Sequence, residues 1–289
     1  MSHSTVALEA YLDDPVLERY TNEFSRFVRV GDVDIHYRDE GEGEPVVLVH
    51  GAFSSLHTYD VWADHLRDHF RVIRLDMPGF ALTGPNAANR YSMEGQVEYL
   101  IRFLDALGIA DCHIAGSSLG GWVSWEAAAR YPERFNRMIL IGAAGFITRD
   151  TMPLPFKMMQ APFAGRVVKF ALKRSLMEVF MRQVFHDPSR ITSEMLDRYY
   201  HLNARPGNPE AFYRIVNSPF IDNTQHLRRI KMPVLLMWGE HDKWVPLEHA
   251  GRFAEILPNT ETLVYPHAGH IPMEEIADES VDDAIDFLR

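Results

Sequence analysis

The sequence predicts an α/β fold in which a mostly parallel central sheet carries helices on both faces and a helical cap is inserted after the sixth strand. Short apolar runs, of the kind buried on both faces, alternate with segments of helical periodicity along most of the chain. The alternation stops between Gly145 and Lys231, where helical stretches rich in Met and Phe replace it. Strands that alternate with helices form a parallel sheet covered on both sides.

Residues 1–27 are expected to form an N-terminal helical extension. Asp14 is suited to the N-cap and Pro15 to the first helical position. The apolar residues that follow share one face at helical spacing: Leu17, Tyr20, Phe24 and Phe27. A helix over 15–27 is therefore predicted, with this face packed on the protein, because Glu18 and Glu23 do not suit an anionic lipid surface.

The sheet is expected to begin with an antiparallel edge hairpin. Val33, Ile35 and Tyr37 alternate with polar residues, and Gly31-Asp32 separates them from the run 27–30. Six short apolar runs then predict the remaining strands: 46–49, 72–75, 113–115, 138–141, 234–237 and 262–265. Between the second and third of these runs, Ser92 and Gly108 bracket a helical pattern. The core of the fold is assigned to 28–146 and 231–289.

Residues 147–230 are predicted to form a helical cap over the rim of the sheet. A loop of this length is uncommon without structure of its own, and residues 166–186 have helical propensity. The segment is rich in Met and Phe, whose apolar and partly deformable side chains suit acyl or aryl groups. Met158 and Phe163 are the candidate residues for the substrate pocket.

Composition excludes several classes of partner. The 289 residues are 46% hydrophobic and 24% charged, and the net charge of −11 disfavours nucleic acid and anionic lipid surfaces. No apolar stretch approaches the ~20 residues that span a bilayer, so no stable membrane insertion is expected. The N-terminus lacks a signal-peptide pattern, so the expected location is cytoplasmic. Cys112 is the only cysteine, which precludes an internal disulfide. No residue pattern predicts an oligomeric state.

The main chemical motif is the pentapeptide Gly116-Ser117-Ser118-Leu119-Gly120. It follows the apolar run ending at Ala115 and precedes the helical segment 122–130. In such an elbow the serine sits on a strained turn from strand to helix, and the flanking glycines let neighbouring chain pass close by. A serine hydroxyl is a poor nucleophile on its own, so Ser118 needs a histidine base and an acid that orients the base.

Candidates for both partners follow strands further along the chain. Asp242 comes after the run ending at Trp238, and His270 comes after the run ending at Tyr265. The carboxyl ends of parallel strands lie along one rim, so these residues are expected to meet Ser118 there. His267 competes with His270, and the pair could bind a metal, but no third ligand cluster accompanies them. We therefore expect His270 as the base, His267 in a structural role, and neither a metal nor another cofactor.

Several motifs together make the chain resemble the α/β-hydrolases, over 28–289. The motifs are Val49-His50-Gly51-Ala52-Phe53, Asp76-Met77-Pro78-Gly79-Phe80, the Ser118 elbow, Trp238-Gly239-Glu240-His241-Asp242 and Gly269-His270. The stretch 76–79 followed by 91–97 is similar to carboxylesterase and monoacylglycerol-lipase-like members of the capped serine-hydrolase branch. This resemblance implies an oxyanion hole formed by the backbone amides of Phe53 and Leu119, and a shaping role for His50.

The expected activity is hydrolysis of a small-molecule carboxylic ester with a hydrophobic acyl or alcohol group, through an acyl-enzyme. Dehalogenases and epoxide hydrolases of this fold use a carboxylate at the elbow, which Ser118 does not supply. Carbon–carbon hydrolases of ring-cleavage products share the triad, but usually carry an asparagine before the serine and a tryptophan after the histidine, where this chain has Ser117 and Ile271. A slow-turnover ligand receptor on the same fold is a further alternative.

Overall fold

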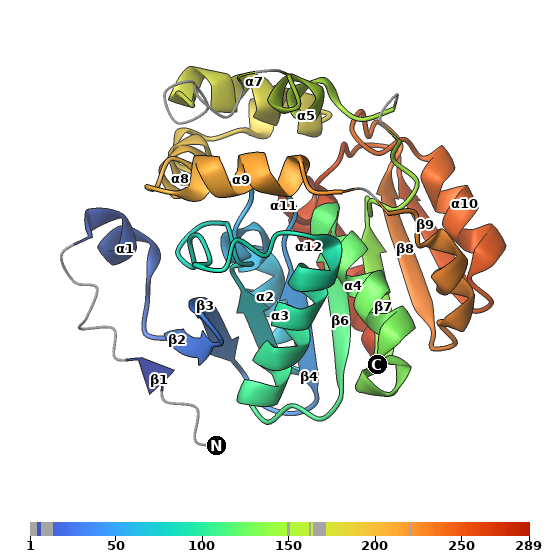
Figure 1. Ribbon diagram of the computed structural model, residues 1–289. Helices are drawn as coiled ribbons and strands as arrows, with labels where there is room; N and C mark the ends of the chain where they lie inside the picture. Colours follow the sequence, from blue (N-terminus) through green and yellow to red (C-terminus); the bar gives the residue numbers. More distant parts are fainter. Residues whose placement is uncertain (1–4, 7–13, 149–150, 162, 164–171, 220) are drawn as a thin grey trace.

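The structure is a computed structural model that describes residues 5–6, 14–148, 151–161, 163, 172–219 and 221–289 (Figure 1). Within these ranges nine strands form one sheet in the order β1-β2-β3-β5-β4-β6-β7-β8-β9. The strands are β1 (Thr5–Val6), β2 (Ser25–Val30), β3 (Val33–Glu40), β4 (Pro45–Val49), β5 (Arg71–Leu75), β6 (Cys112–Ser117), β7 (Phe135–Ile141), β8 (Val234–Gly239) and β9 (Thr260–Tyr265).

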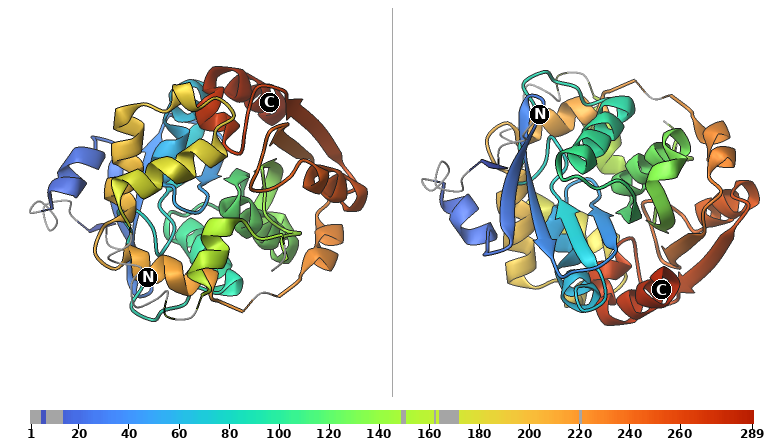
Figure 2. Two further views of the ribbon diagram at one scale, coloured as in Figure 1. Left: turned by 90° about the horizontal axis from the view of Figure 1, so that it is seen from above. Right: turned by 90° about the horizontal axis from the view of Figure 1, so that it is seen from below.

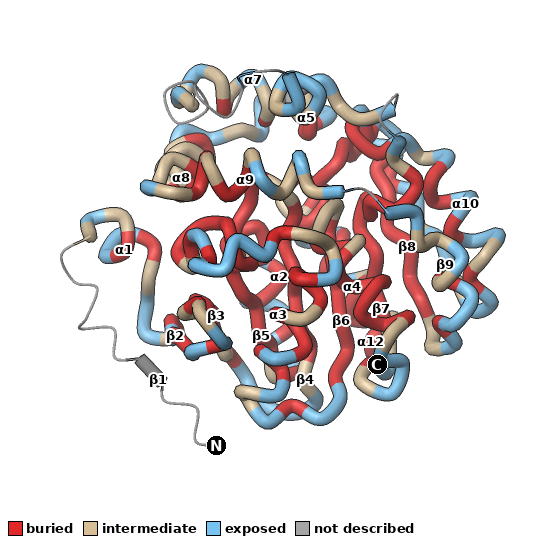
Figure 3. The backbone as a smooth tube through the Cα atoms, viewed as in Figure 1, coloured by how far each residue is buried: buried red, intermediate tan, exposed pale blue. Residues whose placement is uncertain are grey.

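The sheet is antiparallel at one edge and parallel elsewhere. Strands β1, β2, β3 and β5 pair antiparallel, and all later neighbours from β5 to β9 pair parallel. Every residue of β6 and β8 is buried, as expected for parallel strands covered on both faces (Figure 3). The predicted fold class and the edge hairpin are therefore confirmed.

Helices lie on both sides of the strands (Figure 2). Helices α2 and α12 pack together on one face, and α3 and α4 pack together on the other. The helices are α1 (Pro15–Tyr20), α2 (Asp60–Leu66), α3 (Met93–Ala106), α4 (Leu119–Arg130), α5 (Leu154–Met159), α7 (Arg174–Val184), α8 (Ser193–Asn203), α9 (Asn208–Val216), α10 (Glu248–Ile256), α11 (Pro272–Glu275) and α12 (Ala277–Leu288). Short 3-10 turns are η2 (Leu56–Tyr59), η3 (Pro132–Arg134), η4 (Pro188–Arg190) and η5 (Thr224–Arg229).

The inserted helices α5, α7, α8 and α9 lie over the end of the sheet at which the parallel strands finish (Figure 1). The insertion follows β7, which is the sixth strand when the short β1 is left out of the count. The predicted helix over 166–186 is found as α7 (Arg174–Val184), whereas 166–171 lie outside the described residues. Within the described residues, none of the helices is both long and apolar enough to cross a membrane.

The N-terminal helix is shorter than predicted. Helix α1 has the expected cap, in which the Asp14 side chain accepts from the Val16 N–H, but it ends at Tyr20. Thr21 is extended, and its hydroxyl donates to the Leu17 carbonyl, so the helix stops there. Residues from Ser25 onward join the sheet instead, because pairing with β3 gives Phe27 a buried strand position.

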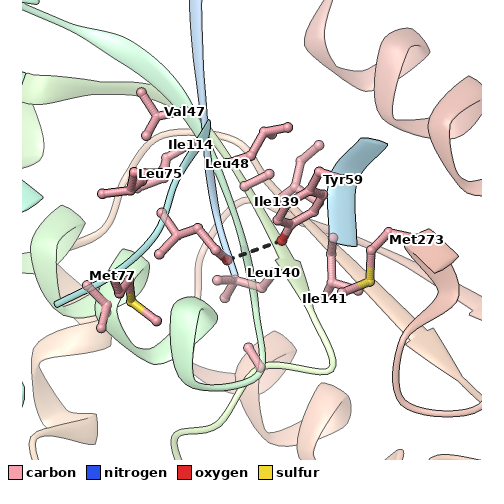
Figure 4. Packing of buried hydrophobic residues seen from close by; sticks show 14 of the residues in the cluster. Val47, Leu48, Tyr59, Leu75, Met77, Ile114, Ile139, Leu140, Ile141 and Met273 are labelled. Carbon is pink, nitrogen blue, oxygen red and sulfur yellow. Dashed lines mark hydrogen bonds between the residues drawn. The ribbon is translucent and has the colours of Figure 1, made fainter. Parts of the chain in front are cut away.

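The hydrophobic core lies between the sheet and its helices. Figure 4 shows Val47, Ile114, Ile139 and Leu140 from three adjacent parallel strands packed with their neighbours. The phenol of Tyr59 enters this cluster and donates to the Val49 carbonyl at 3.2 Å, so its polar end is satisfied. Each fully buried Val, Leu or Ile side chain contributes about 1.5–3 kcal/mol relative to an exposed one. The loops at the strand ends thus rest on a rigid base.

Candidate active site

Ser118 occupies a strained turn between β6 and α4. Its φ of 53° and ψ of −115° lie outside the regions that non-glycine residues ordinarily adopt. The turn is held by its backbone: the Ser118 N–H donates to the Ile141 carbonyl at 2.9 Å, and the Ser118 carbonyl accepts from the Ala144 N–H at 3.0 Å. Neighbouring structure fixes a conformation that the residue alone would avoid, as expected at a nucleophile elbow.

The glycines of the elbow are required by close approaches. A Cβ on Gly116 would overlap the Ser124 hydroxyl and the Gly120 carbonyl, and a Cβ on Gly120 would overlap the carbonyls of Val49 and His50. Helix α4 therefore packs directly against the end of β4. This packing places the N-terminus of α4, and Ser118 with it, at the rim of the sheet.

Asp242 and His270 meet at the same rim. Asp242 follows β8 and His270 follows β9, and Asp242 Oδ2 lies 2.7 Å from His270 Nδ1. The other carboxylate oxygen, Oδ1, accepts from the Trp244 and Val245 N–H groups at 2.8 Å each. Both side chains are buried. The carboxylate is thus oriented by its own loop and in turn orients the imidazole.

The remaining link of the triad is open in this structure. His270 Nε2 is buried and has no hydrogen-bond partner among the described residues. Ser118 and His270 line one pocket, but within the described chain no hydrogen bond joins them. His267, the competing histidine, is exposed. The structure therefore brings His270 onto Asp242 and leaves its other nitrogen facing the cavity of Ser118.

The two amides assigned to the oxyanion hole belong to Phe53, which lines the inner pocket together with Ser118, and to Leu119, the next residue after Ser118. Phe53 has a φ of 59° in the loop after β4, and Leu119 is the first residue of α4. Neither N–H has an acceptor within the part of the chain that is described. The helix N-terminus adds a partial positive charge there. Both amides are thus available to a developing negative charge.

The Phe53 loop is tied down by buried hydrogen bonds. His50 Nδ1 lies 2.7 Å from the Gly51 carbonyl, and His50 Nε2 accepts from the Met77 N–H at 3.0 Å. Burial lowers the pKa of His50, so the neutral ring with its proton on Nδ1 satisfies both contacts. From the insertion, the Asn203 amide donates to the Phe53 carbonyl at 2.6 Å. The geometry gives His50 the shaping role that the resemblance implies.

Two cavities open at Ser118. The inner pocket, with a volume of about 30 Å³, reaches His270 and is walled by apolar side chains such as Met177, Met181 and Val184. The outer cavity, of about 800 Å³, runs beside Leu119 and Trp122 under the insertion. Ala52, Ser118 and Trp244 line both. The inner pocket is much the smaller of the two, and the outer cavity is of the size that binds small organic molecules.

The cavities offer little charge. Arg130 is the one Lys or Arg side chain among the described residues that line either cavity, and it pairs with the buried carboxylate of Glu126 at 3.1 Å. The carboxylate of Glu94, which also lines the outer cavity, lies 3.8 Å from Arg130. Behind the inner pocket, Arg198 pairs with Glu274 at 2.6 Å. Glu274 also accepts from the Tyr199 hydroxyl at 2.6 Å. The charges near Ser118 are therefore already neutralised.

The structure places the two predicted pocket residues outside both cavities. Met158 and Phe163 are 62% and 67% exposed, and the same segment lines the outer cavity with Phe156 and Gln160 instead. The apolar content of the segment could not show which side of a short helix faces inward. Sequence reasoning also missed Trp244, which lines both cavities; its position two residues after Asp242 was an available signal.

Residues 44–276 match the family described as the alpha/beta hydrolase fold. This chain therefore belongs to the α/β-hydrolase family, and it is a hydrolase. The strained Ser118 turn and the Asp242–His270 pair occupy the positions at which this family carries its catalytic groups.

Relatives with assigned activities refine the comparison. The chain is 30% identical to a 2-hydroxy-6-oxo-2,4-heptadienoate hydrolase of Pseudomonas putida, over 86% of this chain and 90% of the relative. It is also 30% identical to a 2-hydroxy-6-oxo-6-phenylhexa-2,4-dienoate hydrolase of Comamonas testosteroni, over 92% and 96%. The structure of a meta-cleavage product hydrolase of Pseudomonas fluorescens superimposes with a TM-score of 0.79 at 27% identity, over 89% and 94%. These relatives match the carbon–carbon hydrolase alternative better than the carboxylesterase and monoacylglycerol-lipase-like branch.

Proposed function

We propose that this hydrolase cleaves uncharged carboxylic esters through an acyl-enzyme on Ser118. The supporting observation is that neither cavity offers an unpaired cation: among the described lining residues Arg130 is the only Lys or Arg, and it pairs with Glu126 and with Glu94, which also lines the outer cavity. Moving a carboxylate into an apolar site without a partner is strongly unfavourable, whereas an ester carries no such penalty. The site therefore suits a substrate without formal charge.

The reaction follows from the positions of the groups. Ser118 Oγ attacks the ester carbonyl while His270 Nε2 takes the hydroxyl proton, and the Phe53 and Leu119 amides stabilise the oxyanion. His270 then gives this proton to the alcohol oxygen, which leaves as the alcohol. Water attacks the acyl-enzyme and gives a proton to His270. The bond between the acyl carbon and Ser118 Oγ then breaks, His270 returns the proton to Oγ, and the free acid leaves. Asp242 holds the imidazole throughout.

A second candidate is carbon–carbon bond hydrolysis of a 2-hydroxy-6-oxo-dienoate. The relatives favour it, because several hydrolases of such dienoates are similar to this chain over most of its length. Two features argue against it. Ser117 and Ile271 stand where those enzymes usually have asparagine and tryptophan, and a dienoate carboxylate would find no unpaired cation among the described lining residues.

Parallel assays of two substrates test the proposal. We expect kcat/KM for methyl butyrate, followed by acid release, to exceed that for 2-hydroxy-6-oxo-2,4-heptadienoate, followed by loss of dienoate absorbance, by roughly 30-fold or more. That factor corresponds to about 2 kcal/mol for an unpaired carboxylate. Faster turnover of the dienoate would replace the ester proposal with the second candidate. A single slow burst on both substrates, with raised thermal stability, would indicate the receptor alternative.

A further inference from the structure

The two cavities that meet at Ser118 are lined by different parts of the catalytic machinery. His270 and Ile271 line the inner pocket, whereas Leu119 and Trp122, at the start of α4, line the outer cavity. A carbonyl carbon bound at Ser118 carries one substituent toward each side. The distribution of these residues therefore determines which substituent is expelled.

The expelled group must lie beside the proton donor. When the tetrahedral intermediate collapses, the C–O bond to the alcohol breaks and the alcohol oxygen takes the proton from His270 Nε2. This transfer requires the oxygen within hydrogen-bond reach of Nε2, which is buried and without a partner among the described residues. The inner pocket is the cavity that His270 lines.

We infer that the alcohol part occupies the inner pocket and the acyl part the outer cavity, so that the preferred substrates are esters of a bulky apolar acid with a short, uncharged alcohol. This inference rests on the proposed ester hydrolysis and specifies its substrate class. The contrast in volume carries it: the inner pocket, at about 30 Å³ against about 800 Å³, takes the smaller substituent, and the outer cavity has room for a long or aromatic acyl chain.

The wall behind the inner pocket excludes a charged alcohol. Tyr199 lines the pocket, and its hydroxyl donates to Glu274, whose carboxylate also accepts from Thr58 at 2.5 Å and pairs with Arg198. This carboxylate is fully engaged and cannot serve a cationic alcohol without giving up these bonds. Burial raises the pKa of the Tyr199 phenol, so the wall stays uncharged. Met177, Met181 and Met273 also line this pocket, and their flexible side chains can yield to a methyl or ethyl group.

Two isomeric esters test the orientation on the unaltered protein. Methyl octanoate and heptyl acetate have the same atoms and the same apolar content, but they exchange the large and small substituents. We expect kcat/KM for methyl octanoate to be at least 10-fold higher, measured by acid release. Equal rates, or faster hydrolysis of heptyl acetate, would overturn the inferred orientation. Methyl butyrate, which has small substituents on both sides, separates the orientation from the proposed ester hydrolysis. If methyl butyrate is hydrolysed while the two isomers react equally, ester hydrolysis stands and only the orientation is wrong.

Two variants separate the cavities. Ile215→Trp narrows the outer cavity and should lower kcat/KM for methyl octanoate at least 5-fold while changing kcat/KM for methyl acetate less than 2-fold.

Met181→Ala enlarges the inner pocket and should raise the ratio of kcat/KM for heptyl acetate to kcat/KM for methyl octanoate at least 5-fold. Met181 is buried, so folding of this variant is checked by circular dichroism, and Met177→Ala, on the same wall, is its replacement. An unchanged ratio in a folded variant would contradict the assignment of the inner pocket.

Discussion

Two of the residues that the proposed reaction uses hold strained backbone conformations. Ser118 and Phe53 are two of the five non-glycine residues with positive φ in the described chain, and in the proposed reaction they would supply the nucleophile and one oxyanion amide. A conformation of this kind costs about 1–3 kcal/mol and persists only where surrounding contacts enforce it. Here those contacts are backbone hydrogen bonds at Ser118 and the Asn203 side chain at the Phe53 carbonyl.

Removing the nucleophile should abolish turnover without unfolding the protein. Ser118→Ala is expected to lower kcat for methyl butyrate by roughly 10⁴-fold or more, because the proposed acyl-enzyme forms on the Ser118 hydroxyl. Its unfolding temperature should stay close to that of the unaltered protein, because the Ser118 side chain makes no hydrogen bond in the described structure. Ser124→Ala is the matched control: its buried hydroxyl donates to the Gly120 carbonyl outside both cavities, so activity should persist. A Ser118→Ala variant that kept turnover would move the nucleophile elsewhere.

At the residue scale, the sequence predicts the site residues that directly follow strands, but it does not predict those that an inserted helix brings to the site. Asp242 and His270 could be predicted because a parallel sheet brings strand ends to one rim. Asn203 and Tyr199 could not, because they reach the site from α8, and no periodicity within α8 specifies what the helix will cover. The orientation of an inserted helix is decided by its contacts with the sheet domain.

At the scale of elements, the junction of β6 with α4 sets the site. The helix can start at the rim only because Gly120 lets its first turn touch the carbonyls of Val49 and His50. The pentapeptide made this junction predictable. The end of the N-terminal helix was harder to predict, because Phe27 fits both a helical face and a strand face. Only the pairing of β2 with β3 decides between the two. Local patterns cannot weigh that long-range pairing.

Substituting Gly120 should damage the protein far more than substituting a helical glycine in open space. Gly120→Ala forces a methyl into the backbone of β4, where carbonyls cannot move aside, and should lower the free energy of unfolding by about 3 kcal/mol or more. Gly251→Ala, in α10 with no neighbouring atom within 4 Å, should instead raise it by about 0.5–1 kcal/mol. Urea unfolding of both variants measures the contrast. Equal stability of the two would show that the close approach at Gly120 is not required.

At the scale of the whole molecule, a buried polar network supports the loop that carries Phe53. Asp76 Oδ1 accepts from the Leu56 N–H at 2.8 Å, and Asp76 Oδ2 lies 2.8 Å from His36 Nδ1. Burial opposes ionisation of Asp76, but its hydrogen bond and electrostatic interaction with His36 prevail, so its pKa lies below the usual value. His57 extends the network: its Nε2 lies 3.1 Å from an Arg38 guanidinium nitrogen and 3.0 Å from the Tyr20 carbonyl oxygen. The loop is thus anchored to β3 and β5 by groups that water does not reach.

This network should make the protein sensitive to mild acid. Burial lowers the pKa of His57 from 6.5 to about 3, and the Arg38 charge acts in the same direction, although Asp60 opposes it. The folded state therefore keeps His57 neutral while the unfolded chain takes up a proton below pH 6.5. Stability from this residue is fully present above pH 6.5 and is lost as the pH falls toward 3, by up to about 1.4 kcal/mol per pH unit.

The pH dependence of the unfolding free energy can be assigned to His57 by replacing this residue with one that does not titrate. Unfolding free energies of the unaltered protein and of His57→Gln, measured by urea, should both decrease as the pH is lowered from 7 to 4.5. The slope of unfolding free energy against pH should be smaller for the variant, by an amount that corresponds to close to one proton. The comparison concerns the slope, because the variant also loses packing and its overall stability is lower. Nuclear magnetic resonance should find the His57 ring neutral in the folded protein at pH 5. A charged ring at that pH, or identical slopes, would show that burial does not hold this histidine in its neutral form and that acid acts on the fold through other groups.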